Sequence, residues 1–378
     1  MSTSQQAGVV DEADRRFMTR ALELARLGIQ TTHPNPRVGC VLARDGTVLA
    51  EGWHERAGGP HAEVVALRAA AAAGVDVRGA TAYVTLEPCS HQGRTPPCSD
   101  ALIAAGITRV VAALGDPNPQ VNGRGFAQLR AAGIRVDTGL MAVEAAQLNA
   151  GFLKRMAHGL PFVRLKLAMS LDGRTALANG ASQWLTSEAA REDVQHWRAA
   201  SAAMLTGIGT VLADDPRLSV RLPGTVRQPL RVVLDRHLQI PPSARLFEGA
   251  QGVLVFTTAG TLAAAEEHRA ALERAGARVL PVPGNDNGRL DLSAVMRALA
   301  AEGVNEVFAE TGARMAGPLL QAGVVDELLL YVAPMLLGPL ARPLVDWPPL
   351  ASLDEAPHFA LHEAAQIGPD LRLRLRPA

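Results

Sequence analysis

Three potential metal ligands and one acidic residue lie in two short stretches of the sequence. The first, GGPHAEVVALRAA (58–70), contains His61 and Glu63, and the second, TLEPCSHQGRTPPCSDALIAAG (85–106), contains Cys89 and Cys98. One imidazole and two thiolates form a ligand set that suits Zn²⁺ and leaves a fourth position for water. Two thiolates neutralise the charge of the ion, and its Lewis acidity can still let the bound water ionise near neutral pH. We therefore predict a zinc site formed by His61, Cys89 and Cys98.

Glu63 follows His61 by two residues and is not needed as a ligand. A carboxylate beside a zinc-bound water can take its proton and pass it to a leaving amine. The pattern H-x-E followed by P-C-x-x-C is the signature of zinc-dependent nucleobase deaminases, but here eight residues separate the two cysteines. The alternative is that Cys89 and Cys98 are ordinary buried cysteines and that His61 only begins a helix. That structural role suits Cys40, which lies in an apolar strand-like run.

The elements around these residues indicate how they can meet. The run 80–88 is a predicted strand, and Cys89 leaves its carboxyl end after Pro88. Cys98 follows two prolines at the start of a predicted helix over 98–106, where unpaired N–H groups and the helix dipole favour a thiolate. A second predicted helix opens just after Pro60 and begins with His61. The four residues thus lie at element ends.

Strands and helices alternate along the chain, which predicts an α/β fold, and a length of 378 residues favours two domains. In the first half we predict a hairpin over 40–54 with its turn at Asp45–Gly46, and a helix within 144–161. We place the boundary there, between a domain of residues 1–155 and a domain of residues 156–378. In the second half, predicted strands cover 162–170, 202–207, 229–235, 252–258, 277–282, 304–310 and 325–334, and predicted helices cover 187–200, 262–275, 292–302 and 314–322.

Composition argues against nucleic-acid and membrane partners. The 37 basic and 37 acidic residues balance and form no long basic run, so no nucleic-acid partner is expected. The N-terminus is polar, and no apolar run approaches the roughly 18 residues that span a bilayer. Three cysteines favour a reducing compartment, so we expect a cytoplasmic protein. The apolar run 327–338 is typical of either a core or a subunit interface, and we expect a homo-oligomer.

Longer stretches resemble the bifunctional deaminase–reductases of riboflavin biosynthesis, whose deaminase half has this spacing between the cysteines. The matching stretches are THPNPRVGCVLARDG (32–46), YVTLEPCSHQGRTPPCSDALI (83–103), DPNPQVNGRG (116–125) and NAGFLKR (149–155). The resemblance implies a cytidine-deaminase-like three-layer domain with one Zn²⁺, followed by a dihydrofolate-reductase-like α/β domain that uses NADPH. It implies a small-molecule substrate, 2,5-diamino-6-ribosylamino-pyrimidinone 5′-phosphate, that is deaminated and then reduced to 5-amino-6-ribitylaminouracil 5′-phosphate.

By this resemblance Glu63 is catalytic, and the deaminase substrate contacts are Asn35, His54, His91, Arg94 and Asn118. The residue types agree, because an Asn amide can match the donors and acceptors of a pyrimidine and an Arg suits a phosphate. Structural roles remain open for four of them. Asn35 and Asn118 each precede a proline and could be turn residues, and His91 and Arg94 could belong to a solvated loop.

The second half resembles the same family in the stretches 164–187, 205–221 and 309–334. The implied NADPH contacts are Ala168, Trp184, Thr210, Asp214, Gly312, Ala313, Arg314, Met315, Ala316, Gly317 and Pro318. The implied substrate contacts are Ser182, Arg198, Leu218, Arg221 and Glu310. Gly312 and Gly317 lie around a predicted helix start, where backbone N–H groups could meet the phosphates of the cofactor.

Further roles rest on side-chain chemistry. Arg198 and Arg221 could form a fork for the sugar phosphate, although Arg198 could also be a charge on a helix surface. Arg236, just after a predicted strand, is our candidate partner for the 2′-phosphate of NADPH. Lys166 and Asp172 are candidates for handling a proton, although a lysine in a strand is more often a satisfied edge residue.

Two other functions stay open. The chain could be a single-function zinc deaminase acting on a nucleoside or tRNA base, with a decayed second domain. The neutral charge and the intact motifs of the second half argue against this. Alternatively, the second half could be a non-catalytic, nucleotide-binding regulator.

Overall fold

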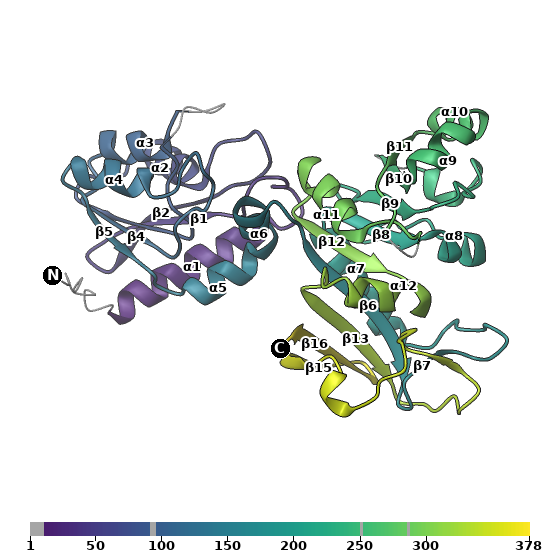
Figure 1. The fold of residues 1–378 in the computed structure, drawn as a ribbon. Coiled ribbons are helices and arrows are strands. Elements are labelled where there is room, and N and C mark those ends of the chain that lie inside the picture. The colour runs from purple at the N-terminus through teal and green to yellow at the C-terminus, as the bar shows by residue number, and fades with distance from the viewer. Residues whose placement is uncertain (1–10, 91–95, 250–251, 286–287) are drawn as a thin grey trace. The chain divides into compact units, whose positions relative to one another are not determined.

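A computed structural model describes residues 11–90, 96–249, 252–285 and 288–378, and the chain divides after His158 into two units, each with its own sheet and core (Figure 1). The boundary that we predicted between residues 155 and 156 lies inside α6 (Ala150–His158), the last helix of the first unit.

The sheet of the first unit has the strand order β2-β1-β3-β4-β5. β1 (Gly39–Arg44) is antiparallel to β2 (Thr47–Trp53) and β3 (Thr81–Val84), whereas β3, β4 (Arg109–Ala112) and β5 (Arg135–Thr138) are parallel. The predicted turn is present, since Asp45 and Gly46 both have the positive φ that a two-residue hairpin turn requires. The helices before α6 are α1 (Glu12–Leu27), α2 (Ala62–Ala72), α3 (Cys98–Ala104), α4 (Arg124–Ala131) and α5 (Ala142–Leu148).

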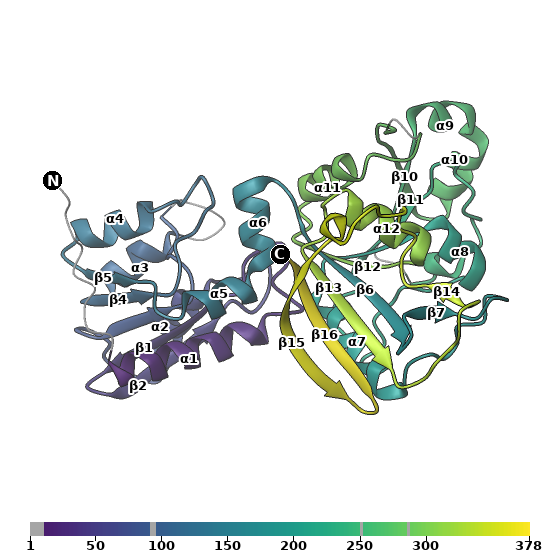
Figure 2. The same ribbon diagram turned by 60° about the horizontal axis from the view of Figure 1, so that its bottom comes forward.

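Helices cover both faces of this sheet. Along β1, Cys40 and Leu42 pack in a core with α2, α3 and α4, while Val41 and Ala43 pack in a core with α1 and α5. Successive residues of a strand point to opposite faces, so the alternation along β1 supplies both cores. Figures 1 and 2 show the resulting three layers, and the predicted fold class of this domain is confirmed.

The sheet of the second unit has the strand order β11-β10-β9-β8-β12-β6-β13-β16-β15. Its strands are parallel from β11 to β13, and β16 and β15 add an antiparallel hairpin at one edge. The strand bounds are β6 (Phe162–Ser170), β8 (Ala203–Gly207), β9 (Leu230–Leu234), β10 (Val253–Thr257), β11 (Ala277–Pro281), β12 (Glu306–Glu310), β13 (Glu327–Ala333), β15 (Phe359–Ile367) and β16 (Asp370–Pro377). Apart from this sheet, β7 (Arg174–Ala176) pairs with β14 (Arg342–Pro343). The helices are α7 (Glu188–Ala200), α8 (Ile208–Asp214), α9 (Ala259–Ala264), α10 (Glu266–Arg274), α11 (Leu292–Ala301) and α12 (Ala313–Gln321).

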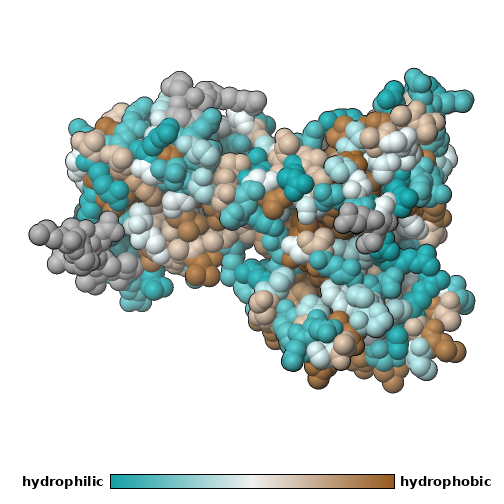
Figure 3. All heavy atoms as spheres, viewed as in Figure 1, coloured by the Kyte–Doolittle hydropathy of each residue, from teal (hydrophilic) through white to brown (hydrophobic). Residues whose placement is uncertain are grey.

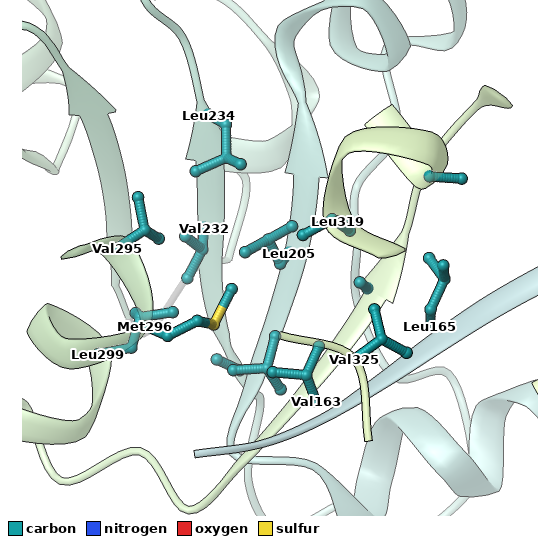
Figure 4. Packing of buried hydrophobic residues seen from close by; sticks show 14 of the residues in the cluster. Val163, Leu165, Leu205, Val232, Leu234, Val295, Met296, Leu299, Leu319 and Val325 are labelled. Carbon is teal, nitrogen blue, oxygen red and sulfur yellow. The ribbon is translucent and has the colours of Figure 1, made fainter. Parts of the chain in front are cut away.

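This sheet is also covered on both faces. Figure 4 shows one core, in which Leu205 of β8 and Val232 of β9 pack with Leu299 of α11 and Leu319 of α12. Residues of α7, α8 and α10 pack on the other face. Strands covered on both faces are mostly apolar, and every residue of β13, including Glu327 at its start, is buried between β6 and β16.

Several elements differ from those predicted, among them α8 and the β7–β14 pair, which were not predicted. The predicted helix over 262–275 is divided into α9 and α10 at Ala265, whose backbone is not helical. The predicted helix over 144–161 is divided at Asn149, because the side chain of Asn149 accepts from the N–H of Arg37 and donates to its carbonyl, both at 2.8 Å. The β15–β16 hairpin was not predicted, although residues 371–376 alternate between Leu and Arg.

Apolar residues are mostly inside these units. On the face shown in Figure 3, small hydrophobic patches are scattered among hydrophilic residues. Across the described part of the chain, no helix is both long enough and apolar enough to cross a membrane.

Candidate active sites

The predicted metal ligands come together in the first unit. Nδ1 of His61 lies 3.5 Å from Sγ of Cys89 and 3.4 Å from Sγ of Cys98. A Zn²⁺ ion bound tetrahedrally to an imidazole nitrogen and a thiolate would separate those two atoms by about 3.5 Å. All three ligand atoms lie within 4.8 Å of one another. The donor set and its spacing therefore fit zinc, with one position left for water.

The ends of two helices position these ligands. His61 is the N-cap of α2, Cys98 is the first residue of α3, and Cys89 lies directly against the start of α3. The N–H of Cys98 donates to Sγ of Cys89 at 3.4 Å, and the N–H of Ser99 donates to the carbonyl of Cys89 at 3.1 Å. Hydrogen bonds from Cys98 and His61 lower the pKa of the Cys89 thiol, which favours the thiolate that a metal binds.

Glu63 faces the same space without belonging to the ligand set. It lies in the first turn of α2, is 3% exposed, and lines a cavity of about 160 Å³ together with His61 and Cys89. Burial raises the pKa of Glu63, so its carboxyl group binds a proton more readily than an exposed glutamate does. The position of this carboxyl suits proton transfer beside the metal site.

Asn35 and His54 form a hydrogen-bonded pair in the wall of this cavity. Nδ1 of His54 lies 2.9 Å from the carbonyl of Pro60, and its Nε2 lies 3.0 Å from Nδ2 of Asn35. Because a carbonyl only accepts, Nδ1 carries the proton and Nε2 accepts from the Asn35 amide. Burial lowers the pKa of His54, which keeps the ring neutral as this arrangement requires. The amide of Asn35 is thus oriented by His54.

Asn118 also lines the cavity, and it is a turn residue as well. Its N–H donates to Asp116 at 2.8 Å, and its Oδ1 accepts from the N–H of Gln120 at 3.0 Å. His91 and Arg94, the other two predicted substrate contacts, lie outside the described residues.

Sequence reasoning missed Glu87, a buried carboxylate that also lines the cavity. Its two oxygens accept four backbone N–H groups at 3.0–3.3 Å, which belong to Asp116, Gly123, Gly125 and Phe126. The carboxylate therefore holds the segment that carries Asn118 and the start of α4. Its position directly before Pro88 and Cys89 could have marked Glu87 as part of the site. Its four backbone donors, however, lie 29 to 39 residues later in the sequence, so local sequence does not reveal them.

A larger cavity of about 1100 Å³ lies in the second unit. Lys166 of β6, Gly207 of β8 and Glu310 of β12 line it at the carboxyl half of these parallel strands, where α/β sheets bind ligands. Pockets for one drug-sized ligand measure roughly 300–1,000 Å³, so this cavity can hold a cofactor beside a substrate. The predicted contacts that line it are Ala168, Ser182, Trp184, Arg198, Thr210, Asp214, Arg221, Glu310, Gly312, Ala313, Arg314 and Met315.

The wall of this cavity is basic. Among the described residues that line it, six are cations and three are carboxylates: Lys166, Arg191, Arg198, Arg221, Arg314 and Arg342 against Asp214, Glu310 and Asp346. An excess of positive charge in a cleft favours anionic ligands such as phosphates.

Arg198 does not offer the open fork that we predicted. Its Nε and Nη2 donate to the two oxygens of Glu310 at 2.6 and 2.7 Å, and its Nη1 donates to the carbonyl of Ser219 at 3.0 Å. Nor is Arg198 a charge on a helix surface, because its side chain is only 12% exposed. The guanidinium of Arg221, in contrast, has neither a hydrogen-bond acceptor nor a salt bridge among the described residues.

Five predicted contacts do not line the cavity. Leu218 is 3% exposed and packs in a core with Ala190 and Val194. Arg236 is exposed at the end of β9. Ala316, Gly317 and Pro318 lie inside α12, within the helix that we predicted over 314–322. A Cβ at Gly317 would lie 2.0 Å from the carbonyl oxygen of Asp346, so close packing explains this glycine.

The two candidates for proton transfer differ. Lys166 lines the cavity, and burial lowers its pKa although Glu310 opposes the shift. Asp172 does not line it. Its carboxylate accepts from Ser170 and from the N–H groups of Leu337 and Gly338, which lower its pKa to about 2. Asp172 therefore ties two loops together, and Lys166 is the candidate that lines the cavity.

Comparisons with known proteins cover both units. The model of the RibD C-terminal domain matches residues 161–373, and the model of the cytidine and deoxycytidylate deaminase zinc-binding region matches residues 11–114. The riboflavin biosynthesis protein RibD of Escherichia coli (strain K12) is 51% identical, over 96% of this chain and 99% of that protein. RibD of Haemophilus influenzae is 46% identical, over 96% of each chain.

Two solved structures extend the match to three dimensions. RibD of Acinetobacter baumannii (form 1) superposes with a TM-score of 0.88 at 44% identity, over 97% of this chain and 99% of that chain. The diaminohydroxyphosphoribosylaminopyrimidine deaminase/5-amino-6-(5-phosphoribosylamino)uracil reductase of Thermotoga maritima superposes with a TM-score of 0.86 at 34% identity, with the same coverage.

Proposed function

This chain belongs to the RibD family of riboflavin biosynthesis proteins, and from that membership we propose which residues carry out each of its two reactions. The enzyme is bifunctional. It deaminates 2,5-diamino-6-ribosylamino-pyrimidinone 5′-phosphate hydrolytically in a zinc-dependent step, and then reduces the ribosyl chain with NADPH to give 5-amino-6-ribitylaminouracil 5′-phosphate.

In the deaminase unit, His61, Cys89 and Cys98 hold the metal and Glu63 transfers the proton. When bound there, Zn²⁺ supplies a Lewis acid that makes water a nucleophile at neutral pH. The Glu63 carboxylate takes a proton from the attacking water and passes it to the ring amine, which leaves as ammonia. The observation that carries this assignment is that Glu63 shares one buried cavity with two of the ligands and yet lies outside the ligand set.

Asn35 and Asn118, which line this cavity, are the proposed contacts of the pyrimidine ring. His54 orients the Asn35 amide through the pair described above, so Asn35 presents a fixed pattern of donors and acceptors. His91 and Arg94 complete the proposed set, with Arg94 suited to the 5′-phosphate.

In the reductase unit, Glu310 and Arg198 form a rigid ion pair next to Lys166 and Arg221. When bound in the larger cavity, NADPH supplies the hydride for the carbon that was the anomeric carbon of the ribose. The backbone N–H groups at the start of α12 are placed to bind a phosphate of the cofactor. Lys166 is the proposed proton donor to the substrate, because its lowered pKa eases loss of a proton. Arg236 stays a prediction for the 2′-phosphate.

The test follows the two reactions separately. The protein is incubated with the diaminopyrimidinone phosphate, with and without NADPH, and both ammonia and NADPH oxidation are measured. We expect ammonia in both cases and oxidation of NADPH only after ammonia release. Ammonia without NADPH oxidation would favour a decayed reductase, and NADPH binding without turnover would favour a regulatory second unit.

We also propose that the protein acts in the cytoplasm, which its three free cysteines support because thiols persist in reducing compartments. Homo-oligomer formation and the absence of a nucleic-acid partner stay predictions. Light scattering and a nucleic-acid binding assay at low salt would test them.

A further inference from the structure

Gln195 is a buried polar residue in the wall of the reductase cavity that takes no part in the proposed reactions. It lies on α7 three residues before Arg198, so both side chains extend from the same face of the helix. The residue is 7% exposed. Buried polar groups are normally hydrogen-bonded, so the partners of its amide are informative.

One half of this amide has a partner and the other half has none in the described structure. The N–H of Arg221 donates to Oε1 of Gln195 at 3.0 Å. A backbone N–H can only donate, so it fixes which end of the amide is oxygen and leaves Nε2 as the free end. Among the described residues no acceptor meets Nε2. Nε2 is therefore available to an acceptor on a ligand bound in the cavity.

The surroundings of Gln195 indicate what kind of acceptor this is. Arg221, whose backbone it holds, has an unpaired guanidinium in the same cavity. Lys166 and Arg198 add two positive charges, and Glu310 alone opposes them in this part of the wall. Two unpaired donors in a positively charged environment suit the oxygens of a phosphate.

We propose that Nε2 of Gln195 and the guanidinium of Arg221 together bind the 5′-phosphate of the substrate during the reduction step. The inference rests on the proposed function of this unit. The N-terminus of α12 offers its own backbone N–H groups to a phosphate of NADPH, so we assign the Gln195 and Arg221 donors to the phosphate of the substrate. Gln195 is thus a substrate-binding residue that also positions Arg221.

A purely structural role for Gln195 can be separated from this one, because Gln228 anchors the same loop. Oε1 of Gln228 accepts from the N–H of Val220 at 2.8 Å, and its Nε2 donates to the carbonyl of Val220 at 3.0 Å. Gln228 does not line the cavity. Gln228→Ala therefore loosens the loop without removing a group that can touch a ligand.

The experiment compares Gln195→Glu and Gln195→Met with Gln228→Ala and the wild type. Glu keeps the acceptor for Arg221 but loses the donor and adds a negative charge, whereas Met loses both hydrogen bonds and adds no charge. KM for 5-amino-6-ribosylaminouracil 5′-phosphate is expected to rise about 10- to 100-fold in both Gln195 variants. KM for NADPH and the rate of deamination should stay within about twofold of the wild type.

A second substrate distinguishes the phosphate from the rest of the molecule. With the dephosphorylated ribosylaminouracil, the wild type and Gln195→Met should reduce the substrate equally well. The proposal is overturned if the substrate KM is unchanged in Gln195→Met, if Gln228→Ala raises that KM as much, if the penalty persists without the phosphate, or if KM for NADPH rises in its place. A wild-type enzyme that does not reduce either substrate would instead contradict the proposed function.

Discussion

Gly125 packs directly against the carbonyl of Pro88, so closely that a Cβ at position 125 would lie 2.0 Å from that oxygen. Pro88 immediately precedes the metal ligand Cys89, and the N–H of Gly125 donates to Glu87 at 3.0 Å. The start of α4 is therefore in contact with the segment that carries a zinc ligand. A glycine is needed here for close approach, not for an unusual backbone angle.

Gly125→Ala is expected to force the Pro88 carbonyl away and to displace Cys89 with it. Overpacking of this kind costs about 1–3 kcal/mol, so the first unit should unfold at lower denaturant concentration and retain less zinc. Ammonia release should fall, while NADPH oxidation with the deaminated substrate should not change. Gly115→Ala is the matched control, since its Cβ would meet only ordinary contacts at 3.7 and 3.8 Å. Equal zinc content and stability in the two variants would contradict this account.

Glu63→Gln should separate metal binding from catalysis. The amide is nearly the same size as the carboxyl and removes no metal ligand, so zinc content should stay at one ion per chain. It cannot take a proton from water, and loss of a general acid–base group lowers rates by roughly 10²–10⁴-fold. Metal analysis and ammonia release on the same sample would check both parts. A zinc-loaded variant with normal deamination would remove Glu63 from the mechanism.

The metal site could be predicted from the sequence because its ligands lie at element ends that the sequence marks clearly. Prolines before Cys89 and Cys98 and the start of a helix at His61 are local signals, and they locate three residues that are distant along the chain. Family resemblance then supplied the substrate and cofactor. Neither kind of signal identifies Glu87, because its partners are backbone groups whose positions depend on the packing of α4.

In the reductase cavity, residue type alone did not predict the roles of two residues. Residue type suggested that Arg198 binds phosphate, but a guanidinium also pairs with any carboxylate that packing brings within reach, here Glu310 on a neighbouring strand end. The resemblance implied that Gly317 contacts NADPH, whereas its lack of a side chain admits the backbone of Asp346. Local sequence cannot distinguish a glycine needed for a ligand from a glycine needed for packing.

Arg198→Lys is expected to weaken reduction without affecting deamination. Lysine has no planar fork, so it cannot make the two parallel hydrogen bonds to Glu310 and the bond to Ser219 together. Hydrogen bonds to charged groups contribute about 1.5–3 kcal/mol, which corresponds to a loss of roughly 10- to 150-fold in kcat/KM.

A double-mutant cycle would check that the pair acts as a unit. Burial alone would raise the pKa of Glu310, but Arg198 and Lys166 outweigh it and keep the carboxylate ionised. Glu310→Gln should therefore reduce kcat/KM by itself, and adding Arg198→Lys should cost much less than it does in the wild type. Additive losses would show that the two residues work independently.

Stability of the second unit should fall in acid because of Glu327. This carboxylate is 0% exposed and pairs with Arg164 of β6 and Arg374 of β16, with Arg376 at 3.7 Å. Burial alone would raise the pKa of Glu327, but these cations lower it from 4.5 to about 2. A lowered folded-state pKa gives stability that is complete above pH 4.5 and is lost as the pH falls towards 2. The difference amounts to roughly 3 kcal/mol.

Glu327→Gln should reveal this dependence in unfolding measurements between pH 7 and pH 2. At pH 7 the variant should lose about 3–5 kcal/mol, because Arg164 and Arg374 remain buried without their partner. Its stability should then change less with pH than that of the wild type, since the titrating group is gone. Glu302→Gln is the control, because Glu302 pairs with Arg278, whose side chain is 60% exposed, and such a surface pair contributes about 0–1 kcal/mol. If the two variants lose similar stability at pH 7, or if Glu327→Gln keeps the full acid sensitivity of the wild type, the pairing of Glu327 is not what stabilises this edge of the sheet.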